Sequence, residues 1–311
     1  MISRDTLTAL TVVLLIFIGA LFTVQTTAVT AYTAEFPATA AAQCTSFASA
    51  PEIEARAAYV LDINTNTVLY KKEASQQLPL ASLTKLMTVL VALETLDPTS
   101  IIAIDPNALD IEGDSGLLAH ELWRIQDLID FTLMTSSNDG AHALALAVEK
   151  SKKDPGSFIK TMNQKTSNLG LSQTYFLNDT GLDVSTSTGG SYGSPRDIAT
   201  LLTYIYKNKT ELFSGSVTPA STFVSISGIT HTASHTSSSV GTLGGEVIAK
   251  TGFTDLAGGN LALVAEPILG RPVAIVVFQS TRTGRDRDIT QLYEYAKTVL
   301  KRDILCRKFS S

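Results

Sequence analysis

LASLTKLM, residues 80–87, predicts the start of a helix that carries two reactive side chains. The apolar residues from here onward recur at the spacing of one buried helical face, namely Leu83, Leu86, Met87, Leu90 and Leu93. Ser82 and Lys85 are three residues apart, so they are neighbours on the helix surface. An amine held unprotonated beside a serine hydroxyl can take its proton and make it a nucleophile. The alternative is an N-cap serine followed by a solvated lysine, and this stretch alone favours that alternative.

Length and charge exclude several classes of protein. A chain of 311 residues can bury a sizeable core in one large domain or two small ones. Its formal net charge of −5 argues against nucleic acid as a partner. Neither a phosphate-binding P-loop nor a dinucleotide-binding glycine fingerprint is present.

The N-terminal residues predict export. Residues 7–24 are apolar and uncharged, longer than the core of a usual signal peptide and near the lower limit for a spanning helix. Arg4 precedes them, so the positive-inside tendency places the remaining chain outside the cytoplasm. We expect a membrane anchor within residues 1–30, followed by a linker over residues 31–54. Small-residue triplets after the apolar run keep a cleaved signal segment, and hence a secreted protein, as the alternative.

The chain has two cysteines, Cys44 and Cys306. Neither is accompanied by a histidine or cysteine cluster of the kind that binds metal, so no metal site is predicted. An oxidising compartment allows a disulfide between them that would join the two ends of the exported domain. Two buried free thiols are the alternative.

Strand patterns at both ends of the chain enclose a helical middle. Strands are expected at residues 57–63, 67–70, 222–226, 246–250, 261–265 and 273–278, and helices after Ser82, at 125–133, 141–150, 158–169 and 195–205, and at 286–300. Gly170 and Ser194 supply the expected end of one helix and the cap of the next. Residues 101–121 and 175–193 are expected to be irregular. The prediction is an α+β fold with three layers, α/β/α, in which helices flank an antiparallel sheet of about five strands and a mainly helical lobe adjoins it.

No histidine is a convincing base for a Ser-His-Asp triad. His231 and His235 lie in a stretch rich in Thr and Ser and are expected in a loop, while His120 and His142 are isolated. Lys85 is therefore the more interesting candidate base.

Two further motifs follow Ser82-x-x-Lys85 in the chain. Ser136-x-Asn138 comes after a predicted helix, and Lys250-Thr251-Gly252 lies near the end of a predicted strand. Each is weak alone, but the three in this order match the S-x-x-K, S-D-N and K-T-G set of penicillin-recognising serine enzymes.

With these motifs the chain resembles the low-molecular-mass D-alanyl-D-alanine carboxypeptidases, which are serine penicillin-binding proteins with a β-lactamase/transpeptidase-like fold. The resemblance extends to residues 58–88, 178–183 and 250–258 and runs from about residue 55 to the end. It implies a serine D,D-peptidase domain over residues 55–311, without the additional C-terminal β domain that such enzymes often carry. The middle residue of the second motif, Ser137, and the stretch 219–245 depart from the family pattern.

The resemblance implies a role for each motif residue. Ser82 would attack the carbonyl between two terminal D-Ala residues, and Lys85 would accept its proton, with burial and a cationic Lys250 keeping Lys85 neutral. Ser136 would pass the proton to the leaving amine. Asn138 would bind the substrate amide and hold Lys85.

The third motif would bind the other end of the substrate. Thr251 would contact the terminal carboxylate, and Gly252 would let the strand approach the substrate closely. The backbone N–H groups of Ser82 and Phe253 would hold the oxyanion. The implied substrate is a peptidoglycan stem peptide ending in D-Ala-D-Ala, β-lactams would be covalent inhibitors, and no cofactor is needed.

Three other functions compete with this interpretation. A class A β-lactamase deacylates through a glutamate between the second and third motifs, yet Glu149, Glu211 and Glu246 lack the asparagine that should follow four residues later. The sequence therefore predicts slow penicillin turnover. A D,D-endopeptidase that cuts peptidoglycan cross-links would carry the same motifs. An inactive wall-binding protein is disfavoured by the intact Lys85 and Lys250.

Overall fold

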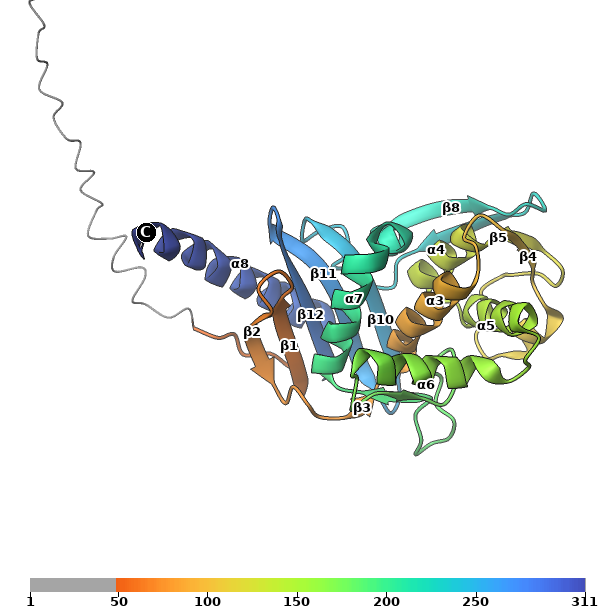
Figure 1. Ribbon diagram of the computed structural model, residues 1–311, viewed down its shortest axis with the longest axis horizontal. Coiled ribbons are helices and arrows are strands. Elements are labelled where there is room, and N and C mark those ends of the chain that lie inside the picture. Colours follow the sequence, from red (N-terminus) through yellow and green to blue (C-terminus); the bar gives the residue numbers. More distant parts are fainter. Residues whose placement is uncertain (1–48, 311) are drawn as a thin grey trace, which may run out of the picture. The chain divides into compact units, whose positions relative to one another are not determined.

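The computed structural model describes residues 49–310 and the side chains of residues 49–306. A five-stranded antiparallel sheet lies at its centre, in the order β10-β11-β12-β1-β2 (Figure 1). Its strands are β1 (Ala57–Asp62), β2 (Thr67–Lys72), β10 (Glu246–Thr254), β11 (Gly258–Ile268) and β12 (Arg271–Ser280). The two ends of the domain meet in this sheet, because β1 pairs with β12. The predicted antiparallel sheet of five strands is confirmed.

Side chains that alternate along the strands build two cores, one on each face of the sheet. Tyr59 and Leu61 of β1 belong to the core beneath α7 (Pro195–Phe213). Ala58 and Val60 belong to the opposite core, which α8 (Gly284–Ser310) covers. This arrangement confirms the three α/β/α layers.

Four helices form a lobe beyond β10 (Figure 1). They are α3 (Thr84–Thr95), α4 (Ile125–Thr135), α5 (Asn138–Lys152) and α6 (Ser157–Leu169). The sequence predicted one buried face for α3, but every residue from Thr84 to Leu93 is buried. The reason is tertiary, because α4, α5, α6 and α7 all pack against α3.

The helix boundaries agree with the capping signals. Ser194 caps α7 by accepting a hydrogen bond from the Asp197 backbone N–H at 3.2 Å. Gly170 follows α6 in the left-handed conformation, with φ of 70°.

Short strands lie within the stretches expected to be irregular and pair with others outside them. They are β3 (Leu78–Pro79), β6 (Tyr175–Phe176) and β7 (Ser191–Gly193) in one small sheet, and β4 (Ile101–Ala103) with β5 (Leu122–Arg124) in another. The turns η1 (Ala81–Leu83), η2 (Pro106–Asp110) and η3 (Ser214–Val217) are 3-10 helices. β3 leads directly into η1, so the small sheet fixes where the chain enters the first motif.

The loop assignment of His231 is wrong. β8 (Ala220–Val224) and β9 (Thr230–Ser234) form a hairpin, and His231 is a buried residue of β9. Its Nε2 lies 2.7 Å from the Glu121 carboxylate, and its ring packs against Trp123. The partner is 110 residues away in sequence, so local composition carried no sign of it.

Several predictions fall partly or wholly outside the described residues. They are the anchor within residues 1–30, most of the linker over 31–54, and Cys44. Within the described part, Ile53 is buried and the Glu54 backbone N–H donates to Asp288 of α8. Cys306 is disulfide-bonded, and its bridge to Cys44 stays a prediction. Among the helices that the structure describes, none is both long and apolar enough to cross a membrane.

Candidate active site

Ser82 lies in η1, one short turn before α3, and not in the first turn of an α-helix as its spacing predicted. Ala81 beside it has φ of 49°, a left-handed conformation that non-glycine residues rarely adopt. Surrounding bonds hold this strained turn, since the Thr84 hydroxyl donates to Ala81 O at 2.7 Å and Asn260 Nδ2 donates to Leu80 O at 3.2 Å. Backbone strain of this kind concentrates at functional sites.

Lys85 is fully buried and directed at Ser82. Its Nζ lies 2.9 Å from Ser82 Oγ and donates to Asn138 Oδ1 at 2.7 Å and Thr180 O at 2.8 Å. Burial lowers the pKa of Lys85 from 10.5 to about 7, although the negative charge of Asp179 acts to raise it. A substantial fraction of this amine is therefore neutral near pH 7, as a base for Ser82 requires.

The second motif brings a second serine to the same place. Ser137, not Ser136, caps α5, because its Oγ accepts from the Gly140 N–H at 2.8 Å. Ser136 has a left-handed backbone, with φ of 64°, and its Oγ lies 2.8 Å from Lys250 Nζ. Asn138 contacts Lys85 through its Oδ1 and Glu112 O through its Nδ2.

Lys250 lies in β10 and is also fully buried. Its Nζ donates to Ser136 Oγ and to Thr251 O, at 2.8 and 2.9 Å. Burial holds the pKa of Lys250 well below its usual value, and the positive charges of Lys85 and Arg285 lower it further. The charge of Lys85 thus disfavours protonation of Lys250, and the expected effect of Lys250 on the pKa of Lys85 stays a prediction.

Gly252 brings β10 against the first motif. A Cβ at this position would lie 2.7 Å from Leu80 O and 3.2 Å from the Ser82 backbone nitrogen, too close for any side chain. Phe253 follows and is 39% exposed. Strand and turn therefore present their backbones to a shared space at Ser82.

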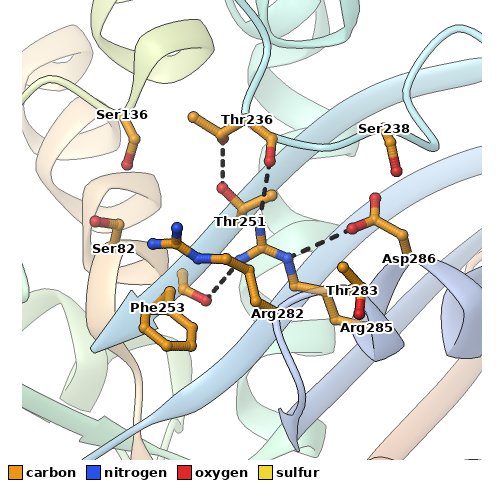
Figure 2. Close-up of a pocket in the computed structure, with 11 residues that line it drawn as sticks. Ser82, Ser136, Thr236, Ser238, Thr251, Phe253, Arg282, Thr283, Arg285 and Asp286 are labelled. Atoms are coloured by element: carbon orange, nitrogen blue, oxygen red, sulfur yellow. Dashed lines mark hydrogen bonds and ion pairs between the residues drawn. The ribbon is translucent and has the colours of Figure 1, made fainter. Parts of the chain in front are cut away.

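That space is a cavity of about 430 Å³ (Figure 2). Ser82, Ser136, Thr251, Gly252 and Phe253 line it. Lys85 and Lys250 are hydrogen-bonded to two of these residues, Ser82 and Ser136, and Asn138 is hydrogen-bonded to Lys85. The structure thus brings all eight predicted site residues together.

Sequence reasoning missed the rest of the lining, which is Thr236, Ser238, Arg282, Thr283, Arg285 and Asp286. Arg285 is buried and donates to Gly252 O at 2.9 Å and Thr236 O at 3.0 Å. The guanidinium of Arg282 lies 4.4 Å from the centre of the Phe253 ring. The positive charges at the start of α8 were the only sequence signal for these residues, and no motif spacing linked them to the site.

Comparisons with known proteins agree with this geometry. The sequence profile of the D-alanyl-D-alanine carboxypeptidase family matches residues 44–282. The chain is 31% identical over 160 residues to D-alanyl-D-alanine carboxypeptidase DacF of Bacillus subtilis, across 50% of the chain and 39% of that protein. It is 32% identical over 241 residues to the D-alanyl-D-alanine endopeptidase of Escherichia coli, across 75% of the chain and 74% of that protein.

A solved structure is similar as well. The ampicillin-bound form of penicillin-binding protein D2 from Listeria monocytogenes superposes with a TM-score of 0.69 at 27% identity. The similarity covers 80% of the chain and 99% of the Listeria protein.

Proposed function

Because the chain belongs to the D-alanyl-D-alanine carboxypeptidase family, we propose that it removes the terminal D-Ala from peptidoglycan stem peptides through an acyl-enzyme on Ser82. One observation carries this proposal. Lys85 Nζ is buried 2.9 Å from Ser82 Oγ, and Lys250 holds Ser136 at the same cavity. A hydroxyl with an adjacent, partly neutral amine is the pair that nucleophilic catalysis without histidine requires.

Acylation would proceed in two steps. Ser82 Oγ would attack the carbonyl carbon of the penultimate D-Ala while its proton moves to Lys85 Nζ. The tetrahedral intermediate would then collapse with cleavage of the C–N bond. Ser136 would deliver its hydroxyl proton to the departing D-Ala amine and take a proton from Lys250 Nζ, which donates a hydrogen bond to it.

The negative charge on the oxygen of the tetrahedral intermediate would be stabilised where η1 meets β10. The backbone N–H groups of Ser82 and Phe253 are proposed to hold this oxyanion. Stabilisation of the oxyanion is usually the largest single contribution to the rate enhancement in acyl transfer. Thr251 is proposed to bind the substrate carboxylate, beside the positive charge of Arg285. Water would then hydrolyse the acyl ester and restore Ser82.

β-Lactams are proposed to acylate the same serine. The Listeria protein whose fold this chain shares is a penicillin-binding protein in complex with ampicillin. The three glutamates between the second and third motifs do not line the cavity, and Glu149 and Glu246 instead accept hydrogen bonds from nearby backbone N–H groups. We therefore expect the penicilloyl-enzyme to be long-lived.

A D,D-endopeptidase is the second candidate. The relative from Escherichia coli that matches three quarters of this chain is named an endopeptidase. Product analysis on linear and cross-linked muropeptides separates the two activities. Release of free D-Ala from linear stems supports the carboxypeptidase, and cleavage confined to cross-linked dimers supports the endopeptidase.

The proposed place of action is the outer side of the cytoplasmic membrane. The apolar residues 7–24, preceded by Arg4, support a membrane anchor at the N-terminus. Fractionation of cells that produce the full chain tests this, with recovery in the culture medium as the opposing result.

The nucleophile is tested with a labelled penicillin. Digestion and mass spectrometry should locate the label on Ser82, and Ser82→Ala should lose both labelling and D-Ala release. Label on another residue, or unchanged D-Ala release by Ser82→Ala, would refute the mechanism.

A further inference from the structure

Two backbone carbonyls of one loop segment hold the face of α3 that carries Lys85. Thr180 O accepts from Lys85 Nζ at 2.8 Å, and Asp179 O accepts from the Thr88 hydroxyl at 2.6 Å. Both donors lie on α3, almost one helical turn apart. The position of Lys85 therefore depends on where Asp179 and Thr180 lie.

The side chain of Asp179 is itself anchored by a histidine. His142 Nδ1 of α5 lies 2.7 Å from Asp179 Oδ2. The side chain of Asp179 is 8% exposed, whereas that of His142 is 26% exposed and reaches solvent. His142, an ionisable residue in contact with water, thus binds the buried carboxylate of Asp179. The backbone carbonyls of Asp179 and Thr180 in turn hold Thr88 and Lys85.

We propose that His142 and Asp179 form a positioning pair for Lys85. Asp179 places a negative charge near the buried amine, and His142 compensates that charge when it is protonated. This inference rests on the proposed function, since it takes Lys85 to be the base in acylation.

The charges around the pair fix the direction of the effect. The charge of Asp179 raises the pKa of Lys85 against the lowering effect of burial. The hydrogen bond to Asp179 raises the pKa of His142 above its usual value, and the charges of Asp179, Glu149 and Asp105 add to this. On the other side of the site, the positive charge of Lys85 lowers the pKa of Lys250.

Two substitutions should therefore shift the pH profile in opposite directions. Asp179→Asn removes the charge that favours the ammonium form of Lys85, so the acidic limb of the acylation profile should move to lower pH. His142→Gln leaves Asp179 uncompensated, so the limb should move to higher pH. A shift of about one pH unit corresponds to a change of about tenfold in the neutral fraction of Lys85 on the acidic side of its pKa.

The double variant separates charge from packing. Without Asp179's charge there is nothing for His142 to compensate, so His142→Gln/Asp179→Asn should show the same limb as Asp179→Asn alone. Two substitutions that merely loosened the structure would add their effects and move the limb in no consistent direction.

The experiment is the rate constant of acylation by a fluorescent penicillin, measured from about pH 5 to pH 9 for the full chain and the three variants. His120→Asn is the matched control, because His120 is exposed and asparagine tolerates its left-handed backbone. Its profile should coincide with that of the parent protein. If Asp179→Asn does not fold, the acylation profile of His142→Gln tests the proposal by itself, because that substitution changes a side chain that contacts solvent.

NMR titration of the imidazole gives a readout independent of catalysis. The chain has four histidines, so the His142 signal is assigned by its loss in His142→Gln. Its titration should move to lower pH in Asp179→Asn. An unchanged His142 titration there, or coincident acylation profiles of the parent and both single variants, overturns the positioning pair while leaving the proposed function intact. A parent protein that the penicillin does not acylate overturns the proposed function and this inference with it.

Discussion

Gly252→Ala is the substitution that most directly tests how β10 and η1 share the site. The new Cβ would lie 2.7 Å from Leu80 O and 3.2 Å from both the Ala81 Cβ and the Ser82 nitrogen. Carbon atoms in good contact are about 3.5–4.0 Å apart, so strand and turn must separate by roughly 0.5–1 Å. All three neighbours belong to, or are fixed to, the backbone, and no flexible side chain is available to yield.

The separation falls on the two backbone N–H groups proposed to hold the oxyanion. A misplacement of about 1 Å can cost about 100-fold in rate, and loss of one oxyanion donor costs about 100- to 1,000-fold. We therefore expect the acylation rate constant of Gly252→Ala to fall at least about 100-fold. Overpacking typically costs about 1–3 kcal/mol, so the variant should remain folded.

The assay is stopped-flow acylation by a fluorescent penicillin, with thermal unfolding measured on the same samples. Gly189→Ala is the matched control, since a Cβ there meets no atom closer than 3.2 Å and the nearest is the Pro79 side chain. Gly189 does not line the cavity, and its variant should react within a few-fold of the parent. A folded Gly252→Ala that reacts at the parent's rate would refute the close approach as a requirement of the site.

Three further predictions concern the base, the core and the disulfide. The acylation rate should rise with pH through a midpoint near the Lys85 pKa of about 7, and Lys85→Arg, which stays charged, should be inactive at every pH; measurable activity in that variant would exclude Lys85 as the base. Glu121→Ala leaves the buried His231 without its hydrogen-bond partner, and should cost about 1–3 kcal/mol in urea unfolding; an unchanged free energy of unfolding would contradict this. Thiol titration of unfolded, unreduced protein should find no free thiol, and two thiols would disprove the bridge between Cys44 and Cys306.

Local spacing predicted the contact between Ser82 and Lys85, because residues three apart meet in any helical turn. The same spacing gave the wrong setting for Ser82. The left-handed Ala81 makes η1 a separate turn, and contacts with distant residues stabilise that conformation. Likewise, periodicity predicted one buried face for α3, whereas packing against four helices leaves every residue from Thr84 to Leu93 buried.

Long-range pairs were beyond the reach of sequence patterns. His142 and Asp179 are 37 residues apart, and His231 and Glu121 are 110 apart. The partner of each histidine is distant in the sequence, so the local pattern gives no sign of it. Ser136 and Lys250 are 114 residues apart, and only the family resemblance placed them at one site.

Residues outside the three motifs determine how the motifs meet. Asn260 of β11 donates to Pro79 O and Leu80 O, at 2.9 and 3.2 Å, and its Oδ1 accepts from the Gln279 N–H of β12. This one side chain joins the turn that carries Ser82 to the interior of the sheet. Because the amide supplies donors and an acceptor at once, a hydrophobic residue of equal volume would leave buried backbone groups on both sides unpaired.

Arg285 joins the sheet to α8 in the same way. Its guanidinium binds Gly252 O of β10 and Thr236 O of the segment after β9, so helix, strand and hairpin converge on one side chain. Asn260 thus ties the turn that carries Ser82 to β11 and β12, and Arg285 ties β10 to α8. Residues outside the three motifs therefore anchor both the turn and the strand that meet at Gly252, which is why motif spacing alone cannot define the site.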